Sequence, residues 1–103
     1  MSITLAAYEF DGPCTSVTSV DDRAGVYAVL SRTENSRYNV VDVGESAGVR
    51  SRLESHDRQP CWERRKVNGI QYAVYYTPGV SQDGRREIEK KIRDAYDPPC
   101  GKV

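Results

Sequence analysis

The chain is short, electrically neutral and mixed in composition. Its 103 residues are 38% hydrophobic and 29% charged, with 15 basic and 15 acidic side chains. These values are typical of one folded domain, and they argue against a disordered chain and against a generic polyanion-binding protein. No apolar run reaches the roughly 20 residues that a membrane-spanning helix needs, so we expect no membrane partner.

The N-terminus and the cysteines bear on the cellular compartment. Residues 1–5 lack the basic start and the apolar stretch of a secretory signal. Cys14, Cys61 and Cys100 are odd in number and irregularly spaced, so they imply no disulfide framework. We therefore expect a cytoplasmic protein with free thiols.

The charge is unevenly distributed along the chain. Residues 1–46 hold three basic against seven acidic side chains, whereas residues 47–103 hold twelve basic against eight acidic ones. The second part could present a basic face to a phosphate backbone. A solvated surface of mixed charge is the alternative.

We expect a single domain over residues 1–103, with an N-terminal strand and loop (1–24) before a compact core (25–101). The segment from Ile3 to Phe10 is β-prone, and Asp11-Gly12-Pro13 then signals a turn. Residues 14–22 are rich in Ser, Thr and Asp, which predicts a loop.

A β-hairpin is predicted next, from residues 25–31 and 38–43. If its turn centres on residues 33–36, Tyr27 lies directly opposite Asp42, and their side chains project from the same face. A slip of one residue would separate the two side chains.

A helix is predicted over about residues 47–57, with Ser46 as its N-cap and an apolar seam of Val49 and Leu53. Gln59-Pro60 ends or interrupts this helix, and Cys61-Trp62 should pack in a second short element.

The strongest strand pattern covers residues 70–77 and contains Tyr72, Tyr75 and Tyr76. At least one of these tyrosines should face solvent, where it could stack on a base, while sheet packing is the expectation for the others. The last helix is predicted over about 83–95. Its expected buried stripe consists of Ile88, Ile92, Ala95 and Tyr96.

The order β-β-β-α-β-α indicates an α+β fold, with a small antiparallel or mixed sheet flanked by helices. Within this order lies a series of residue types that can handle phosphodiesters. It comprises Gly25-Val26-Tyr27, Asp42-Val43-Gly44, Arg52, His56 and Glu89. The four-residue spacing of Arg52 and His56 places them about 40° apart on one helix face.

The series resembles the GIY-YIG nuclease superfamily over residues 25–101. Gly25-Val26-Tyr27 matches the first half-motif, and Asp42-Val43-Gly44 occupies the place of the second. The resemblance implies a small α+β nuclease domain. It also implies an endonuclease, a hydrolase of phosphodiester bonds that depends on Mg²⁺ or Mn²⁺ and acts on DNA, including branched or damaged DNA.

The remaining motif positions also match this superfamily. Arg52, eight residues after Gly44, matches its helix arginine, and His56 matches a histidine of several branches. Glu89, nine residues before Pro98, matches the metal-binding glutamate and the proline after its helix.

The resemblance also implies a role for each matched residue. Tyr27 would accept a proton from the attacking water with help from His56. Arg52 would hold the scissile phosphate, and Glu89 would bind one Mg²⁺ or Mn²⁺. The structural alternatives are a core aromatic at Tyr27, a solvated helix residue at Arg52 and an exposed carboxylate at Glu89.

Two positions depart from the superfamily pattern. Asp42 replaces the tyrosine that opens the second half-motif, and Cys100-Gly101 stands where an asparagine is expected after Pro98. Asp42 could join Glu89 around the metal, receive a proton, or mark a site that no longer cuts. Metal-dependent cleavage and a non-cleaving module that binds nucleic acid or a protein therefore both remain open.

A zinc site made of His56, Cys61 and Cys100 is a third possibility. Its spacing fits no standard zinc motif, and only three ligands are evident.

Overall fold

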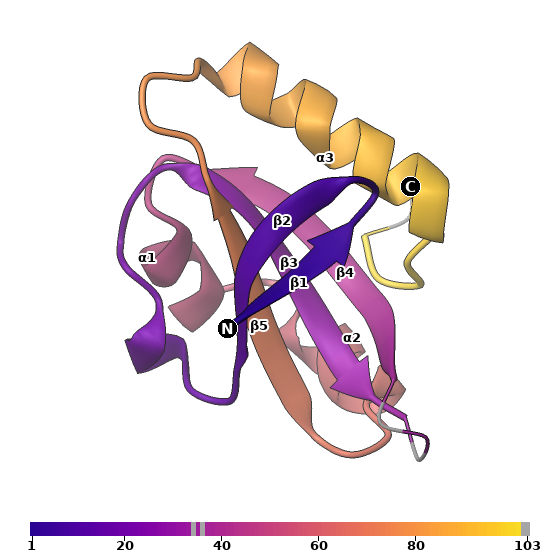
Figure 1. Cartoon of the computed structure of the whole chain (residues 1–103). Coiled ribbons are helices and arrows are strands. Elements are labelled where there is room, and N and C mark those ends of the chain that lie inside the picture. Colours follow the sequence, from indigo (N-terminus) through magenta and orange to yellow (C-terminus); the bar gives the residue numbers. More distant parts are fainter. Residues whose placement is uncertain (34, 36, 102–103) are drawn as a thin grey trace.

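A computed structural model describes residues 1–33, 35 and 37–101. In these residues, five strands form one antiparallel sheet in the order β1-β2-β5-β3-β4, with helices packed around it (Figure 1). The α+β class is confirmed. The elements are β1 (Ser2–Leu5), β2 (Tyr8–Cys14), η1 (Val17–Ser19), β3 (Gly25–Arg32), β4 (Tyr38–Ser46), α1 (Val49–Glu54), α2 (Gln59–Arg65), β5 (Ile70–Tyr76) and α3 (Gln82–Tyr96).

The interior strand β3 joins the hairpin to the rest of the sheet. It pairs with β4 on one side and β5 on the other, and it is buried from Gly25 to Ser31. A strand covered on both faces needs apolar side chains at successive positions, which the run from Val26 to Leu30 provides. The hairpin of β3 and β4 therefore pairs with β5 through β3.

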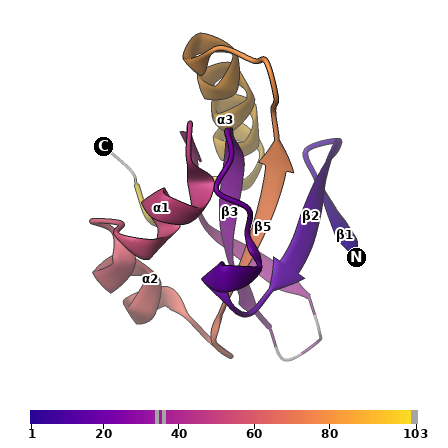
Figure 2. The same ribbon diagram turned by 90° about the vertical axis from the view of Figure 1, so that its left-hand side faces the viewer.

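Two apolar clusters cover the two faces of the sheet. One contains Phe10, Leu30 and Ile92 of α3, and the other contains Leu53 of α1 and Trp62 of α2. Figure 2 shows α1 and α2 together on one side of β3 and β5. No helix within the described residues has the length and apolar character to cross a membrane.

The single N-terminal strand expected from Ile3 to Phe10 is wrong. The structure has two strands, β1 and β2, which pair from Leu5–Tyr8 outward through a two-residue turn. Ala6 and Ala7 form this turn with φ angles of 49° and 70°. Such hairpin turns need positive φ at both positions, and alanine carries no sequence signal for that conformation.

The register expected for the β3–β4 hairpin is also wrong. Tyr27 pairs with Gly44 and Asp42 pairs with Val29, because Val41 is an extra residue that shifts the register. Since the error amounts to two residues at this point, Tyr27 and Asp42 still share one face as diagonal neighbours. Of the predicted turn, residues 34 and 36 lie outside the described residues.

The first helix is shorter than the expected 47–57, because α1 ends at Glu54 and leaves His56 in the following loop. Ser46 does not cap the helix; its Oγ accepts a hydrogen bond from the amide of Gly48, which takes the N-cap position. The predicted second element is confirmed as α2, with Pro60 in its first turn rather than at a helix end.

The last helix is confirmed as α3, two residues longer than expected. Of the predicted stripe, Ile92 is buried and Ile88 half-buried, but Ala95 and Tyr96 are exposed. Arg85 is buried instead, where its Nε donates to Glu45 at 2.9 Å. The three β5 tyrosines are each half-buried and pack against a core cluster.

The expectation of free thiols is wrong for two of the three cysteines. Cys61 of α2 forms a disulfide with Cys100, 39 residues later, while Cys14 is a free thiol. Spacing could not reveal this pair, because only the fold brings α2 beside the turn after α3. The argument from free thiols to a cytoplasmic location therefore no longer holds.

We expect the disulfide to stabilise the fold. Removing it with Cys61→Ser and Cys100→Ser should lower the free energy of unfolding by about 3–4 kcal/mol, because it closes a 39-residue loop. Urea unfolding of the variant and of the reduced wild type measures this loss. Cys14→Ser is the control and should unfold at the midpoint of the oxidised wild type; equal midpoints for the oxidised wild type, the reduced wild type and the double variant would contradict the prediction.

Candidate functional site

Tyr27 and His56 form a buried pair on the α1–α2 face of the sheet. The Tyr27 Oη lies 2.7 Å from His56 Nε2, and the two residues are only 1% and 4% exposed. Gly44 makes room for the phenol, because a Cβ at this position would lie 2.1 Å from the Tyr27 Oη. The glycine of the second half-motif therefore allows the tyrosine of the first to occupy this position.

The backbone determines which nitrogen of His56 carries the proton. The amide of Arg58 donates to His56 Nδ1 at 3.0 Å. A neutral imidazole has one donor and one acceptor nitrogen, so its proton must reside on Nε2. His56 thus donates a hydrogen bond to the Tyr27 Oη.

Burial keeps both members of this pair uncharged at neutral pH. It raises the pKa of Tyr27 to about 12, and the nearby Asp42 carboxylate adds to the effect. Burial also lowers the pKa of His56 to about 4, and the guanidinium groups of Arg52 and Arg58 add to that effect.

Asp42 is fully buried beside this pair and is saturated with hydrogen bonds. Its Oδ1 accepts from the Val43 amide and from Arg93 Nη2, each at 2.8 Å. Its Oδ2 accepts from Arg58 Nε at 2.6 Å and from Trp62 Nε1 at 2.8 Å. These bonds favour an anchoring role for Asp42 over a role as a proton acceptor or metal ligand.

Arg93 links Asp42 to Glu89. Besides Asp42, its guanidinium donates to Glu89 Oε2 at 2.9 Å, to the carbonyl of Cys100 at 3.2 Å and to the carbonyl of Val43. One side chain therefore joins α3, β4 and the C-terminal turn, and it connects two of the residues predicted from the sequence.

Arg52 and Glu89 lie at the rim of the network. The side chain of Arg52 is 38% exposed and that of Glu89 is 23% exposed. Arg52 Nη2 donates to Asp57 Oδ1 at 2.9 Å, and the same oxygen lies 3.3 Å from His56 Nδ1. Arg52 is thus held beside the loop that carries His56, while Nδ1 of the neutral His56 and the Asp57 oxygen are both acceptors and form no hydrogen bond.

The structure brings the five predicted residues together, but as a closed network. Two of the cavities on the described surface measure about 350 Å³ each, and neither of these two is lined by Tyr27, Asp42, Arg52, His56 or Glu89. Sequence reasoning missed Arg58, Trp62 and Arg93. Of these, only Arg93 carried a signal, since it follows Glu89 by one helical turn.

The capacity of the network for a metal ion is limited. Within the described residues, no group of three His, Cys, Asp or Glu side chains could hold one. Glu89 offers a single carboxylate, which suits Mg²⁺ only where water and substrate phosphates supply the other ligands. The zinc alternative is wrong, because Cys61 and Cys100 are oxidised to a disulfide and provide no thiolate.

Comparisons of the chain with protein-family models, with curated proteins and with solved structures found no match.

The depressed pKa of His56 predicts a pH dependence of stability. An unfolded histidine has a pKa near 6.5, so between pH 6.5 and about 4 the unfolded chain binds a proton that the folded chain excludes. The contribution of His56 is therefore fully present above pH 6.5 and is lost as the pH falls to 4, by about 3 kcal/mol. Urea unfolding across this range should show a steeper loss for wild type than for His56→Gln; equal slopes would rule out the effect.

The contact of Gly44 with Tyr27 predicts a strong local effect of an added methyl group. Gly44→Ala should displace the Tyr27 ring, break its bond to His56 and lower the free energy of unfolding by about 2–3 kcal/mol. In a Tyr27→Leu background the same change should cost much less, because the clash is absent. Additive effects in this double-mutant cycle of urea unfolding would contradict the contact.

Proposed function

We propose that this chain is a metal-dependent endonuclease of the GIY-YIG type that hydrolyses phosphodiester bonds in DNA. The observation that supports this most is the 2.7 Å contact of Tyr27 with His56, with Arg52 and Arg58 as the nearby cations. A pair that can transfer a proton, Tyr27 with His56, therefore lies close to two arginines that can bind a phosphate.

Arg52 is the best placed residue to receive the scissile phosphate. It is the most exposed of the arginines in this network, and its partner Asp57 has a side chain 74% exposed to solvent. A solvated ion pair of this kind contributes little to stability, so a phosphate can take the place of the carboxylate. The guanidinium can bind two phosphate oxygens and stabilise the charge that grows on them in the transition state.

Tyr27 would act as the proton acceptor after its hydroxyl has lost its proton to solvent. The Nε2–H of His56 then donates to the phenolate, and Arg58 and Arg52 offset part of the rise in the pKa of Tyr27 that burial and Asp42 cause. The phenolate takes a proton from water, the water oxygen bonds to phosphorus, and the bond from phosphorus to the leaving oxygen breaks. The leaving oxygen takes its proton from solvent.

Glu89 would hold the divalent cation through its carboxylate. When bound, Mg²⁺ or Mn²⁺ would neutralise negative charge on the phosphate and on the leaving oxygen. Because Glu89 also accepts a hydrogen bond from Arg93, its orientation is fixed before any cation binds.

A second function is a module that binds nucleic acid or a protein partner without cleaving. The observation that favours it is the burial of the Tyr27 hydroxyl beneath side chains of the network, since attack by water requires access to it. In that case Arg52 at the rim of the network binds phosphate, while Tyr27, Asp42 and His56 serve as a rigid support.

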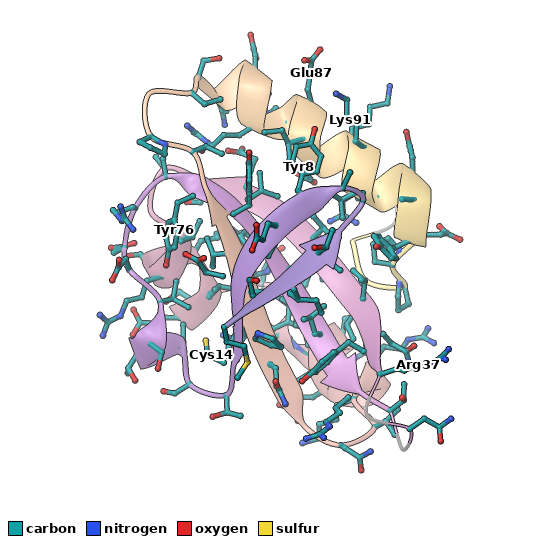
Figure 3. The ribbon with its side chains drawn as sticks, viewed as in Figure 1. Tyr8, Cys14, Arg37, Tyr76, Glu87 and Lys91 are labelled. Atoms are coloured by element: carbon teal, nitrogen blue, oxygen red, sulfur yellow. A yellow bond between two sulfur atoms is a disulfide. The ribbon has the colours of Figure 1, made fainter. Side chains whose placement is uncertain are left out.

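The deciding experiment compares wild type, Tyr27→Phe and Glu89→Gln on branched, single-stranded and duplex DNA, with and without Mg²⁺ or Mn²⁺. For the nuclease we expect metal-dependent cleavage that falls by at least about 100-fold in both variants. The matched control is Glu87→Gln, because Glu87 lies on the same helix and points away from the sheet (Figure 3). It should cleave like wild type.

Each other outcome of this experiment has a definite meaning. Binding that weakens with salt, without cleavage by wild type, overturns the nuclease and supports the non-cleaving module. If wild type neither cuts nor binds any of these nucleic acids, the nuclease hypothesis and the nucleic-acid-binding hypothesis both fail. The remaining hypothesis is then a module that binds a protein partner.

A further inference from the structure

A cavity of about 350 Å³ lies along the outer edge of β4, separate from the residues of the proposed reaction. Its walls come from residues 38–41 of β4, Arg65 of α2, and Tyr96, Asp97 and Pro99 at the end of α3. Since β4 is an edge strand, the cavity opens where the sheet has no further strand. Its volume is at the small end for ligand pockets and suits one planar group.

Two tyrosines give the cavity aromatic walls. Tyr96 is 41% exposed, and its hydroxyl accepts a hydrogen bond from the amide of Ala6 at 3.1 Å, which restrains the ring. Tyr38 is half-buried and packs against the apolar cluster that contains Leu30. Restrained and partly exposed rings of this kind are the usual surfaces on which nucleic-acid bases stack.

The cavity lining also contains a cation, an amide and one carboxylate, that of Asp97. Within the described residues Arg65 has no ion pair, whereas its neighbour Lys66 pairs with Glu63 at 2.6 Å. The Asn39 side chain, also in the lining, offers both a donor and an acceptor. An aromatic surface, an amide and an arginine without an acidic partner match the base, the base edge and the phosphate of a nucleotide.

The cavity adjoins the network around Asp42. Val41, which lines the cavity, directly precedes Asp42, and Pro99 precedes Cys100, whose carbonyl accepts from Arg93. On α2, Trp62 donates to Asp42 and Arg65 follows three residues later, a spacing of about 5–6 Å along one helix face. A strand held at Arg52 would thus continue toward the cavity.

We propose that this cavity is a base-binding subsite for one unpaired nucleotide of single-stranded DNA. The base stacks on Tyr96 and Tyr38, Asn39 contacts its edge, and Arg65 binds the adjoining phosphate. A base inside a duplex is already stacked and paired, so the subsite selects single-stranded segments or strand ends. The inference rests on the proposed function only in taking DNA as the ligand of the neighbouring site.

Binding of a short single-stranded oligonucleotide, measured by fluorescence anisotropy without divalent metal, tests the stacking. Tyr96→Leu should weaken binding by about 5- to 100-fold, because it removes the ring. Tyr96→Phe keeps the ring and should bind like wild type. With an abasic strand of the same length, Tyr96→Leu and wild type should bind equally.

The phosphate contact has a matched pair of variants on α2. Arg65→Gln should reduce the slope of log affinity against log salt by about 0.7, as expected for one lost phosphate contact on a single strand. Arg64 is exposed on the same helix outside the cavity lining, so Arg64→Gln should keep the wild-type slope.

The outcomes separate the subsite from the nuclease. Base-dependent binding by a protein that does not cleave supports the subsite and overturns the nuclease. If wild type cleaves DNA, but Tyr96→Leu binds the intact single strand as tightly as wild type, the subsite alone is overturned. Equal salt slopes for Arg64→Gln and Arg65→Gln, or no binding of single strands by wild type, also overturn the subsite.

Discussion

The buried carboxylate of Asp42 needs donors from several parts of the chain, and the arrangement of the candidate site depends on meeting that need. Arg58 and Trp62 bring α2 to β4, while Arg93 brings α3 to the same point. A charge without solvent exposure is tolerated only when it is paired and hydrogen-bonded. The same bonds that satisfy Asp42 therefore fix the positions of Glu89, through Arg93, and of His56, through the loop before α2.

Within this charged surrounding, Tyr27 and His56 are held in their neutral forms. Burial is the largest influence on the pKa of each, and Asp42 on the tyrosine and the two arginines on the histidine act in the same direction, while charges of the opposite sign offset part of each shift. Desolvation thus keeps both groups neutral, and a ligand that changes the charge beside them also changes their proton affinity.

Periodicity in the sequence located β3, β4, β5 and α3, because each has a clear apolar pattern that packing reinforces. It could not locate the Ala6–Ala7 turn, since alanine has no preference for that conformation, nor the extra residue at Val41, which leaves no mark on the alternation. The residues predicted for the site do come together, yet Arg58 and Trp62 could not be foreseen. Their pairing with Asp42 exists only in three dimensions.

The extra residue at Val41 also bears on which changes of chain length the domain can accept. Leu30 pairs with Val40, and only the bulge moves Asp42 opposite Val29 rather than Ala28. A regular register that kept Val41 would instead carry Asp42 and Gly44 to the opposite face, among the apolar residues around Ile92. Deletion of Val41 would close the bulge and leave Asp42 opposite Val29, whereas deletion of Val43 would turn Gly44 to the other face and away from Tyr27. The Thr33 amide donates to the Arg37 carbonyl where the two strands of the hairpin end. A change in the number of residues between Thr33 and Arg37 leaves the sheet face on which Asp42 and Gly44 lie unchanged.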